Sequence, residues 1–292
     1  MCNGCATGCN IEVQHKNGRA WRLVPRHNPD VNKYWMCDEG RPTYHGLREQ
    51  RLAAPTVDGL PAGWDRALRG AAERIAAAGK AGTAFVLSAV ASNEDNFALA
   101  RLAAALGCSN VFYTGLPPVP GRADGKLRVA DVNPNTAGVR AILDAVGGGA
   151  RELGPASLDA SIRVVVVLGE HLPLRPGGIE ELTVIAIGPH ERGPVARAAV
   201  ALPAAAWAET SGTITNDRGH VQRMHAAVPP PGHAIAGWEA VVRLAHALDV
   251  RLSWAHAREV FKDMTAAVAP WKSLVWAREA RPLALRFAGS RG

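Results

Sequence analysis

The sequence predicts an α/β protein in which a small N-terminal domain with β-hairpins precedes an abbreviated, doubly wound parallel-sheet domain. Three observations lead to this fold class. Four of the five cysteines lie in the first 37 residues, apolar Val/Ile runs alternate with helical segments from about residue 65, and Gly or Pro separates these runs. Continuous apolar strands that alternate with helices are typical of parallel sheets covered on both faces. With 48% hydrophobic and 20% charged residues, the chain can also form a sizeable core.

The N-terminal domain is expected to span residues 1–52, where polar residues and cysteines replace helical periodicity. Residues 11–13 and 20–24 are expected strands. The Asn17-Gly18 pair between them is a strong hairpin signal, because both residues tolerate positive φ. A segment this short needs a covalent or metal staple, which its cysteines could supply.

The α/β domain is expected to span residues 53–250. Its first helix should end at Gly79, its second should be capped by Asn93 and end at Gly107, and Gly147 should end the third. The helices are expected at residues 65–78, 93–106, 136–146 and 236–248. The strands are expected at residues 83–87, 111–113, 127–129, 163–168, 183–187 and 198–202. Residues 211–219 are expected to form a turn-rich loop.

The remaining residues, 251–292, are expected to form a C-terminal tail or a partner-binding segment. Three tryptophans stand there among arginines and prolines, at positions 254, 271 and 276. Aromatic and arginine side chains are enriched at protein interfaces, which favours the partner-binding interpretation.

The charge pattern argues against nucleic acid as a partner. The net charge is +7, but acidic residues are interspersed with the basic ones and no run of five or six like charges occurs. No apolar stretch approaches the ~20 residues of a membrane span, and no signal-peptide core is present. We therefore expect a soluble protein of a reducing compartment that could still dock on a membrane-bound partner.

The spacing of the N-terminal cysteines predicts an iron–sulfur cluster. Three thiols within eight residues and a distant fourth suit a 4Fe–4S cluster, whose four irons each need one thiolate. The expected ligands are Cys2, Cys5, Cys9 and Cys37. Zinc remains an alternative, alone or with His15 or His27, but paired Cys-x2-Cys hooks are missing. Disulfides are disfavoured by the expected compartment. Cys108 stands alone and is expected to be a core thiol.

An anionic cluster should be stabilised by nearby cations and backbone N–H groups. Arg41 is the best placed cation, directly after Gly40 and close to Cys37. The other cations close in sequence are Arg19, Arg22, Arg26 and Lys33. Glycines allow close backbone approach, so the N–H groups around Gly4, Gly8 and Gly40 are expected to reach the cluster sulfurs. Tyr34 and Trp35 are expected either to exclude water beside Cys37 or to have a plain core role.

These residues resemble the cluster domain at the front of the molybdopterin-oxidoreductase superfamily. Residues 26–41 (RHNPDVNKYWMCDEGR) are similar to the large iron–sulfur subunit family of NADH-quinone oxidoreductase, which is respiratory complex I. Residues 208–223 resemble the superfamily's "AE..GT.TN.EGR.Q" loop, with Asp217 and His220 as departures. The resemblance implies a 4Fe–4S domain followed by an α/β domain of the molybdopterin-oxidoreductase type.

Departures from the superfamily pattern predict that molybdopterin is not bound. Its molybdenum enzymes have a Lys or Arg just after the fourth cluster cysteine, where this chain has Asp38-Glu39. Cys108 is the only remaining thiol, and the chain is much shorter than those enzymes. Glu209, Thr213 and Asn216, which would lie near the cofactor in pterin enzymes, are expected to serve packing and turn formation. No catalytic residue is expected.

The resemblance therefore implies an iron–sulfur electron-transfer and scaffold subunit with no substrate site of its own. It would sit in a peripheral arm on the cytoplasmic side of a membrane, among other subunits of a respiratory or hydrogenase-type complex. Because Cys2 follows Met1, we expect either that a partner chain carries the upstream ferredoxin-like domain and covers the cluster, or that this chain begins at an internal Met. The alternatives are a truncated subunit of a formate-dehydrogenase- or hydrogenase-type complex and a four-cysteine zinc module.

Overall fold

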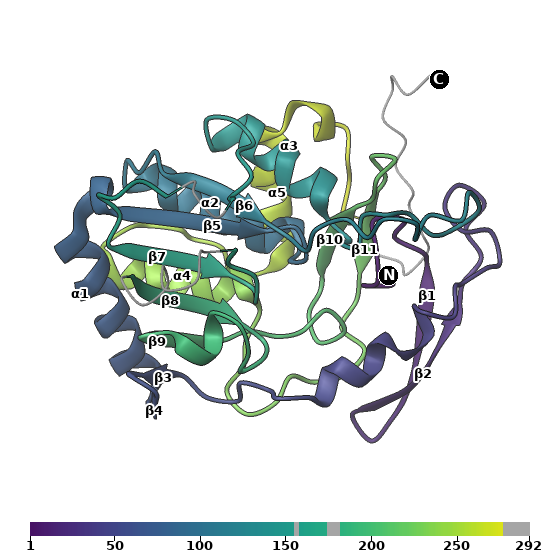
Figure 1. The fold of residues 1–292 in the computed structure, drawn as a ribbon, viewed down its shortest axis with the longest axis horizontal. Coiled ribbons are helices and arrows are strands. Elements are labelled where there is room, and N and C mark those ends of the chain that lie inside the picture. Colours follow the sequence, from purple (N-terminus) through teal and green to yellow (C-terminus); the bar gives the residue numbers. More distant parts are fainter. Residues whose placement is uncertain (155–157, 174–181, 277–292) are drawn as a thin grey trace.

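The computed structural model describes residues 1–154, 158–173 and 182–276 and places a parallel sheet at one end of the molecule and the cysteine-rich domain at the other (Figure 1). In this described part, seven strands form the main sheet, in the order β4-β3-β9-β8-β7-β5-β6. Strands β5 to β9 are parallel, and β3 and β4 form an antiparallel edge. Their bounds are Thr56–Val57 (β3), Leu60–Pro61 (β4), Thr83–Ser88 (β5), Val111–Thr114 (β6), Val164–Leu168 (β7), Thr183–Gly188 (β8) and Val200–Pro203 (β9). The predicted α/β class is confirmed.

The first four α-helices begin and end close to their predicted positions, whereas the fifth was not predicted. The helices are α1 (Trp64–Gly82), α2 (Asn93–Ala105), α3 (Thr136–Val146), α4 (Gly237–Ala247) and α5 (Ala257–Ala267), with short 3-10 helices η1 (Arg41–Arg48), η2 (Val195–Arg197) and η3 (Ala269–Trp271). Gly79, at φ 66°, interrupts α1 where the sequence predicted its end. The residue that caps α2 is Ser92 rather than Asn93, because Ser92 and Asp95 form a reciprocal capping box.

Helix α2 lies at the centre of the α/β domain. Most of its side chains are buried, as expected for a helix that is apolar on nearly all sides. The apolar side chains of the described α-helices join alternate strand residues, among them Phe85, Val166 and Ile185, in one core. The opposite face of the sheet is covered by side chains from connections and from η2, such as Leu153 and Val195.

Two sequence predictions within the α/β domain are wrong. Residues 127–129 form no strand and belong to the long β6–α3 connection, residues 115–135, in which Ala130 and Arg128 accept backbone bonds from Val119 and Asp124 of the same connection. Residues 211–219 form part of a hairpin rather than only a loop, with strands β10 (Gly212–Thr215) and β11 (Val221–Met224). The turn residues at the tip of the hairpin dominate this stretch of sequence, so the two short strands beside them were not predicted.

Helix α5 lies within the expected C-terminal segment and packs on α2. Val260, Phe261 and Met264 are buried in the α/β core, and so is Trp271. The proposed boundaries at residues 52 and 250 stay predictions, and residues 277–292 of the expected tail lie outside the described part.

The N-terminal domain contains the predicted hairpin, with β1 (Ile11–Lys16) paired to β2 (Arg19–Pro25). Asn17 and Gly18 both have positive φ, as the turn requires. The domain is joined to the α/β domain by a buried ion pair between Arg51 and Glu209. None of the helices in the described residues combines the length and the hydrophobicity needed to cross a membrane.

Candidate metal centre

The structure brings together the four cysteines that the sequence predicted as ligands. Cys2, Cys5 and Cys9 are 4–7% exposed, and Cys37 is partly buried. The backbone N–H of Cys2 donates to the carbonyl of Cys9 at 2.8 Å, which closes residues 2–9 into a tight loop. Charge interactions link Cys2 and Cys9 with each other and with Cys5 and Cys37. The thiol of Cys37, distant in sequence, therefore lies within electrostatic range of the other three.

The thiols are held in a site that disfavours their ionised form unless a cationic group is bound. Burial, with smaller contributions from the neighbouring cysteines, raises the pKa of Cys2 to about 11 and that of Cys9 to about 12. Iron and zinc bind cysteine as the thiolate and supply the positive charge that offsets this cost. A buried, all-sulfur donor set of this kind fits an iron–sulfur cluster.

The arrangement of these donors does not favour the zinc alternative. Within the described ranges, no three or more His, Cys, Asp or Glu side chains lie close enough together to hold one metal ion between them. A mononuclear zinc site needs four donors within about 2.0–2.3 Å of one ion. A 4Fe–4S cluster places each thiolate on a different iron and so accepts sulfurs that are farther apart.

Two of the three predicted glycines lie against a cysteine sulfur. A Cβ atom added to Gly40 would lie 3.0 Å from Cys2 Sγ, and one added to Gly4 would lie 3.5 Å from it. The backbone of Gly4 also hydrogen-bonds to Cys2. Gly8 has φ +64°, and a Cβ there would meet Gln222 Nε2 at 2.9 Å rather than a sulfur. The first two glycines therefore give close approach to the ligands, whereas Gly8 fits the domain junction.

The β6–α3 connection covers the cysteine site from the α/β domain. The Thr7 hydroxyl donates to the Leu127 carbonyl at 2.6 Å, and the Ala6 N–H donates to the Asp131 carbonyl at 3.0 Å. Arg122 extends from this connection toward the Cys5 thiol: burial lowers the pKa of the guanidinium, but Cys5 and Glu39 together raise it. Its side chain is only 9% exposed and is also paired with Glu39 at 2.7 Å.

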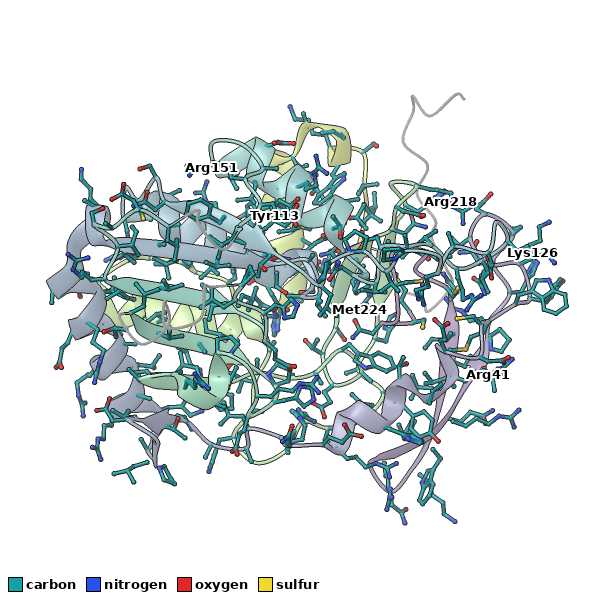
Figure 2. The ribbon with its side chains drawn as sticks, in the orientation of Figure 1. Arg41, Tyr113, Lys126, Arg151, Arg218 and Met224 are labelled. Carbon is teal, nitrogen blue, oxygen red and sulfur yellow. The ribbon has the colours of Figure 1, made fainter. Side chains whose placement is uncertain are left out.

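Arg122 is a site residue that sequence reasoning missed, because it stands 85 residues beyond Cys37 in an irregular segment. The cation predicted there, Arg41, lies at the start of η1 with 44% of its side chain exposed and pairs with Asp38. Figure 2 shows Arg41 on the outside of the N-terminal domain. Of the other predicted cations, Arg19 is stacked on Trp21, 4.4 Å from the ring centroid.

The roles predicted for Tyr34 and Trp35 are both wrong. Their side chains are 69% and 70% exposed, so they neither shield Cys37 nor belong to the core. Met36, the next residue, is buried with Cys2 and Cys9, and Leu127 packs against the same cluster of side chains.

The hairpin that carries the second sequence motif joins the cysteine loop to the α/β core. Asn216 donates to the Thr7 carbonyl at 3.1 Å, and Gln222 donates to the Gly8 carbonyl at 3.1 Å. On its other side, the Thr213 N–H and hydroxyl donate to the buried carboxyl of Glu94 at 2.6 and 2.9 Å. These contacts agree with the packing and turn-forming role expected for the motif.

Cys108 is remote from the other cysteines. Its thiol is buried and donates to the carbonyl of Thr83 at 3.0 Å. Thr83 begins β5, whereas the cysteine site lies beyond the carboxyl ends of the parallel strands (Figure 1). The prediction of a core thiol is confirmed.

Two family models match separate parts of the chain, one in the cysteine-rich N-terminal segment and one in the α/β part. Residues 5–45 match the family model of the NADH-ubiquinone oxidoreductase NDSU1/NuoG-like 4Fe-4S domain. Residues 178–247 match the molybdopterin oxidoreductase model. The resemblance predicted from the two sequence motifs is confirmed.

The curated relatives are much longer than the stretches that match. The G subunit of NADH-quinone oxidoreductase from Rickettsia bellii is 32% identical over 109 residues, which cover 36% of this chain and 16% of the relative. The protein of the same name from Pseudomonas putida is 36% identical over 118 residues, covering 40% and 12%. A nitrate reductase of Klebsiella oxytoca is 44% identical over 69 residues, covering 23% and 8%.

Among solved structures, acetylene hydratase from Pelobacter acetylenicus has a similar fold. The TM-score is 0.63 at 12% sequence identity, and the superposition covers 91% of this chain and 72% of the other. At this identity the likeness concerns the fold alone.

Proposed function

We propose that this chain is an iron–sulfur electron-transfer and scaffold subunit of an NADH-quinone oxidoreductase (complex I) type assembly. Cys2, Cys5, Cys9 and Cys37 would hold one 4Fe–4S cluster. The observation that carries this proposal is the convergence of four thiols, of which Cys5, Cys9 and Cys37 lie in the segment that matches the NuoG-like 4Fe-4S domain and Cys2 lies three residues before it. A bound cluster would supply one-electron redox chemistry.

The protein's own contribution is to bury the ligands and to balance their charge. The β6–α3 connection excludes water from one side and brings the Arg122 guanidinium to Cys5. The hairpin β10–β11 holds the cysteine loop through its backbone carbonyls. The α/β domain thus acts as the scaffold of the cluster domain, and we assign no catalytic residue to either.

We further propose that the chain binds no molybdopterin. The acidic pair Asp38-Glu39 follows Cys37, at the place where the superfamily's molybdenum enzymes have a Lys or Arg. Glu39 is paired with Arg122 and Arg128, so the charges of these two cations are already balanced. Cys108 lies at the amino end of β5, whereas the cysteine site lies beyond the carboxyl ends of the parallel strands. Cys108 is therefore in no position to bind a metal beside the cysteine site. This supports electron transfer or scaffolding rather than substrate turnover.

The partners proposed are other subunits of the assembly, including a chain that carries an upstream ferredoxin-like domain. Two of the three curated relatives named above are NADH-quinone oxidoreductase subunits, which supports this choice. The proposed location is the peripheral arm on the cytoplasmic side of the membrane.

Anaerobic purification followed by EPR spectroscopy after dithionite reduction tests the ligand assignment. We expect a 4Fe–4S signal in the wild type and in Cys108→Ala, and its loss in Cys9→Ala. The two cysteines are matched controls, because both are buried and only one belongs to the proposed ligand set. A signal that persists unchanged in Cys9→Ala contradicts the proposal.

Metal analysis of the same wild-type protein separates the alternatives. Molybdenum would support a formate-dehydrogenase- or hydrogenase-type subunit. A colourless protein with one zinc per chain would support the zinc module.

A further inference from the structure

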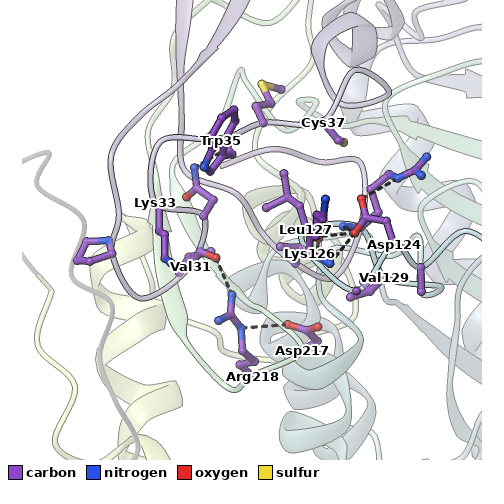
Figure 3. Close-up of a pocket in the computed structure, with 17 residues that line it drawn as sticks. Val31, Lys33, Trp35, Cys37, Asp124, Lys126, Leu127, Val129, Asp217 and Arg218 are labelled. Carbon is purple, nitrogen blue, oxygen red and sulfur yellow. Dashed lines mark hydrogen bonds and ion pairs between the residues drawn. The ribbon is translucent and has the colours of Figure 1, made fainter.

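A pocket of about 880 Å³ opens beside Cys37, the least buried of the four cysteines. Figure 3 shows the lining residues, with Trp35 and Cys37 on one side and Asp217 and Arg218 across from them. Leu127 and other residues of the β6–α3 connection complete the wall. The pocket is therefore where the proposed cluster comes closest to the outside of the described structure.

The loop that carries Trp35 is rigid, although its aromatic side chains are exposed. Asn28 and Lys33 exchange backbone hydrogen bonds of 2.9 and 2.6 Å. The Asn32 amide donates to the Trp35 carbonyl at 2.9 Å, and Arg218 donates to the Val31 carbonyl at 2.7 Å. A rigid loop that presents aromatic side chains loses little entropy when a partner binds them.

The exposed aromatic side chains of this loop have no folding role that accounts for their position. Trp35 makes no core contact, and Tyr34 is stacked only on His27, with ring centroids 4.0 Å apart. Trp and Tyr anchors dominate the energetics of protein interfaces, where they are buried on binding. Their position points to a protein partner.

The charges at the pocket are predominantly positive. Four cations and two carboxylates line it, and both carboxylates are already engaged. Asp124 accepts from three backbone N–H groups and from Arg128, and Asp217 lies 3.9 Å from Arg218. Lys33 and Lys126 form no ion pair among the described residues. These two cations remain available to an acidic surface.

We propose that Lys33, Tyr34, Trp35 and Lys126 form a docking face around Cys37 for an acidic electron-transfer protein. The aromatic pair would anchor the partner, the lysines would select an acidic one, and Cys37 would bring the partner's redox group near the cluster. The inference rests on the proposed function, since without a cluster a redox partner has no counterpart in this chain.

Binding measurements with two electron-transfer proteins of opposite charge test this docking face. The probes are an acidic flavodoxin and a basic cytochrome c, each titrated against the intact iron-loaded chain at low and at high salt. We expect the flavodoxin to bind and its Kd to rise with salt, because the lysine contribution is screened. Cytochrome c is expected to bind at least about tenfold more weakly.

Substitutions in the docking face test which residues contact flavodoxin. The double variant Lys33→Glu/Lys126→Glu and the variant Trp35→Ala are each expected to raise the flavodoxin Kd about tenfold or more. Lys80→Glu and Trp21→Ala are matched controls, because both residues are exposed and lie outside the lining of this pocket. Their Kd should stay within about twofold of the wild type.

Iron and sulfide content, measured on every variant, separates this inference from the proposed function. Protein without iron and sulfide refutes the proposed function, whatever it binds. Protein that carries the cluster but binds flavodoxin no better than cytochrome c refutes the docking face alone. A Kd that is unchanged in Trp35→Ala and in the double variant also refutes it.

Discussion

Replacing Arg122 should lower the midpoint potential of the proposed cluster. The guanidinium lies within electrostatic range of Cys5 and pairs with Glu39 at 2.7 Å, and its side chain is almost fully buried. Reduction adds one negative charge, so removal of this cation in Arg122→Gln disfavours the reduced state. A hydrogen bond to a charged group contributes about 1.5–3 kcal/mol, which for one electron corresponds to about 65–130 mV.

A potentiometric titration followed by EPR measures this shift, and two variants serve as controls. Arg122→Lys keeps the charge and should shift the potential by less than about 30 mV. Arg41→Gln removes a largely exposed cation that is paired with Asp38, and its shift should stay below about 20 mV because solvent screens it. A potential that is unchanged in Arg122→Gln, or a larger shift in Arg41→Gln, would refute the reasoning.

Two further predictions concern the glycines and the buried carboxyl. Gly40→Ala should reduce the iron bound per chain, because its Cβ would lie 3.0 Å from Cys2 Sγ, whereas Gly4→Ala, at 3.5 Å, should retain normal iron content. Burial raises the pKa of Glu94 from 4.5 to about 8, so the folded state binds the extra proton and stability falls as pH rises from about 4.5 to about 8. Thermal unfolding across this range should show a larger fall in the wild type than in Glu94→Gln, in which the buried Asp95, whose pKa is also raised by burial, still contributes; parallel curves would contradict it.

Much of the fold could be predicted from local sequence signals. The Asn17-Gly18 turn, the break at Gly79 and the continuous Val/Ile runs depend on residues that are neighbours in the chain. The strands at 212–215 and 221–224 could not be predicted in the same way. Their pairing is stabilised by distant residues, among them Glu94, which bonds to Thr213 across 119 positions.

The same distinction between residues that are neighbours in the chain and residues that are distant in it applies to the candidate site. The spacing of Cys2, Cys5 and Cys9 suggested a donor set because those three residues lie within eight positions of one another, and the addition of the distant Cys37 as the fourth ligand stays a prediction. Closeness in the sequence did not identify the cation beside the cysteines. The predicted Arg41 points outward, and Arg122 approaches the site from the α/β domain. The role predicted for Trp35 was also wrong, because the side chain is exposed. The distance of an aromatic residue from Cys37 along the chain does not determine whether its side chain is buried.

Iron and acid-labile sulfide analysis of the anaerobically purified wild-type chain, with zinc and molybdenum measured in the same sample, tests the central claim most directly. The proposed function predicts about four iron and four sulfide per chain, with neither zinc nor molybdenum in stoichiometric amount. One zinc per chain without iron would contradict it.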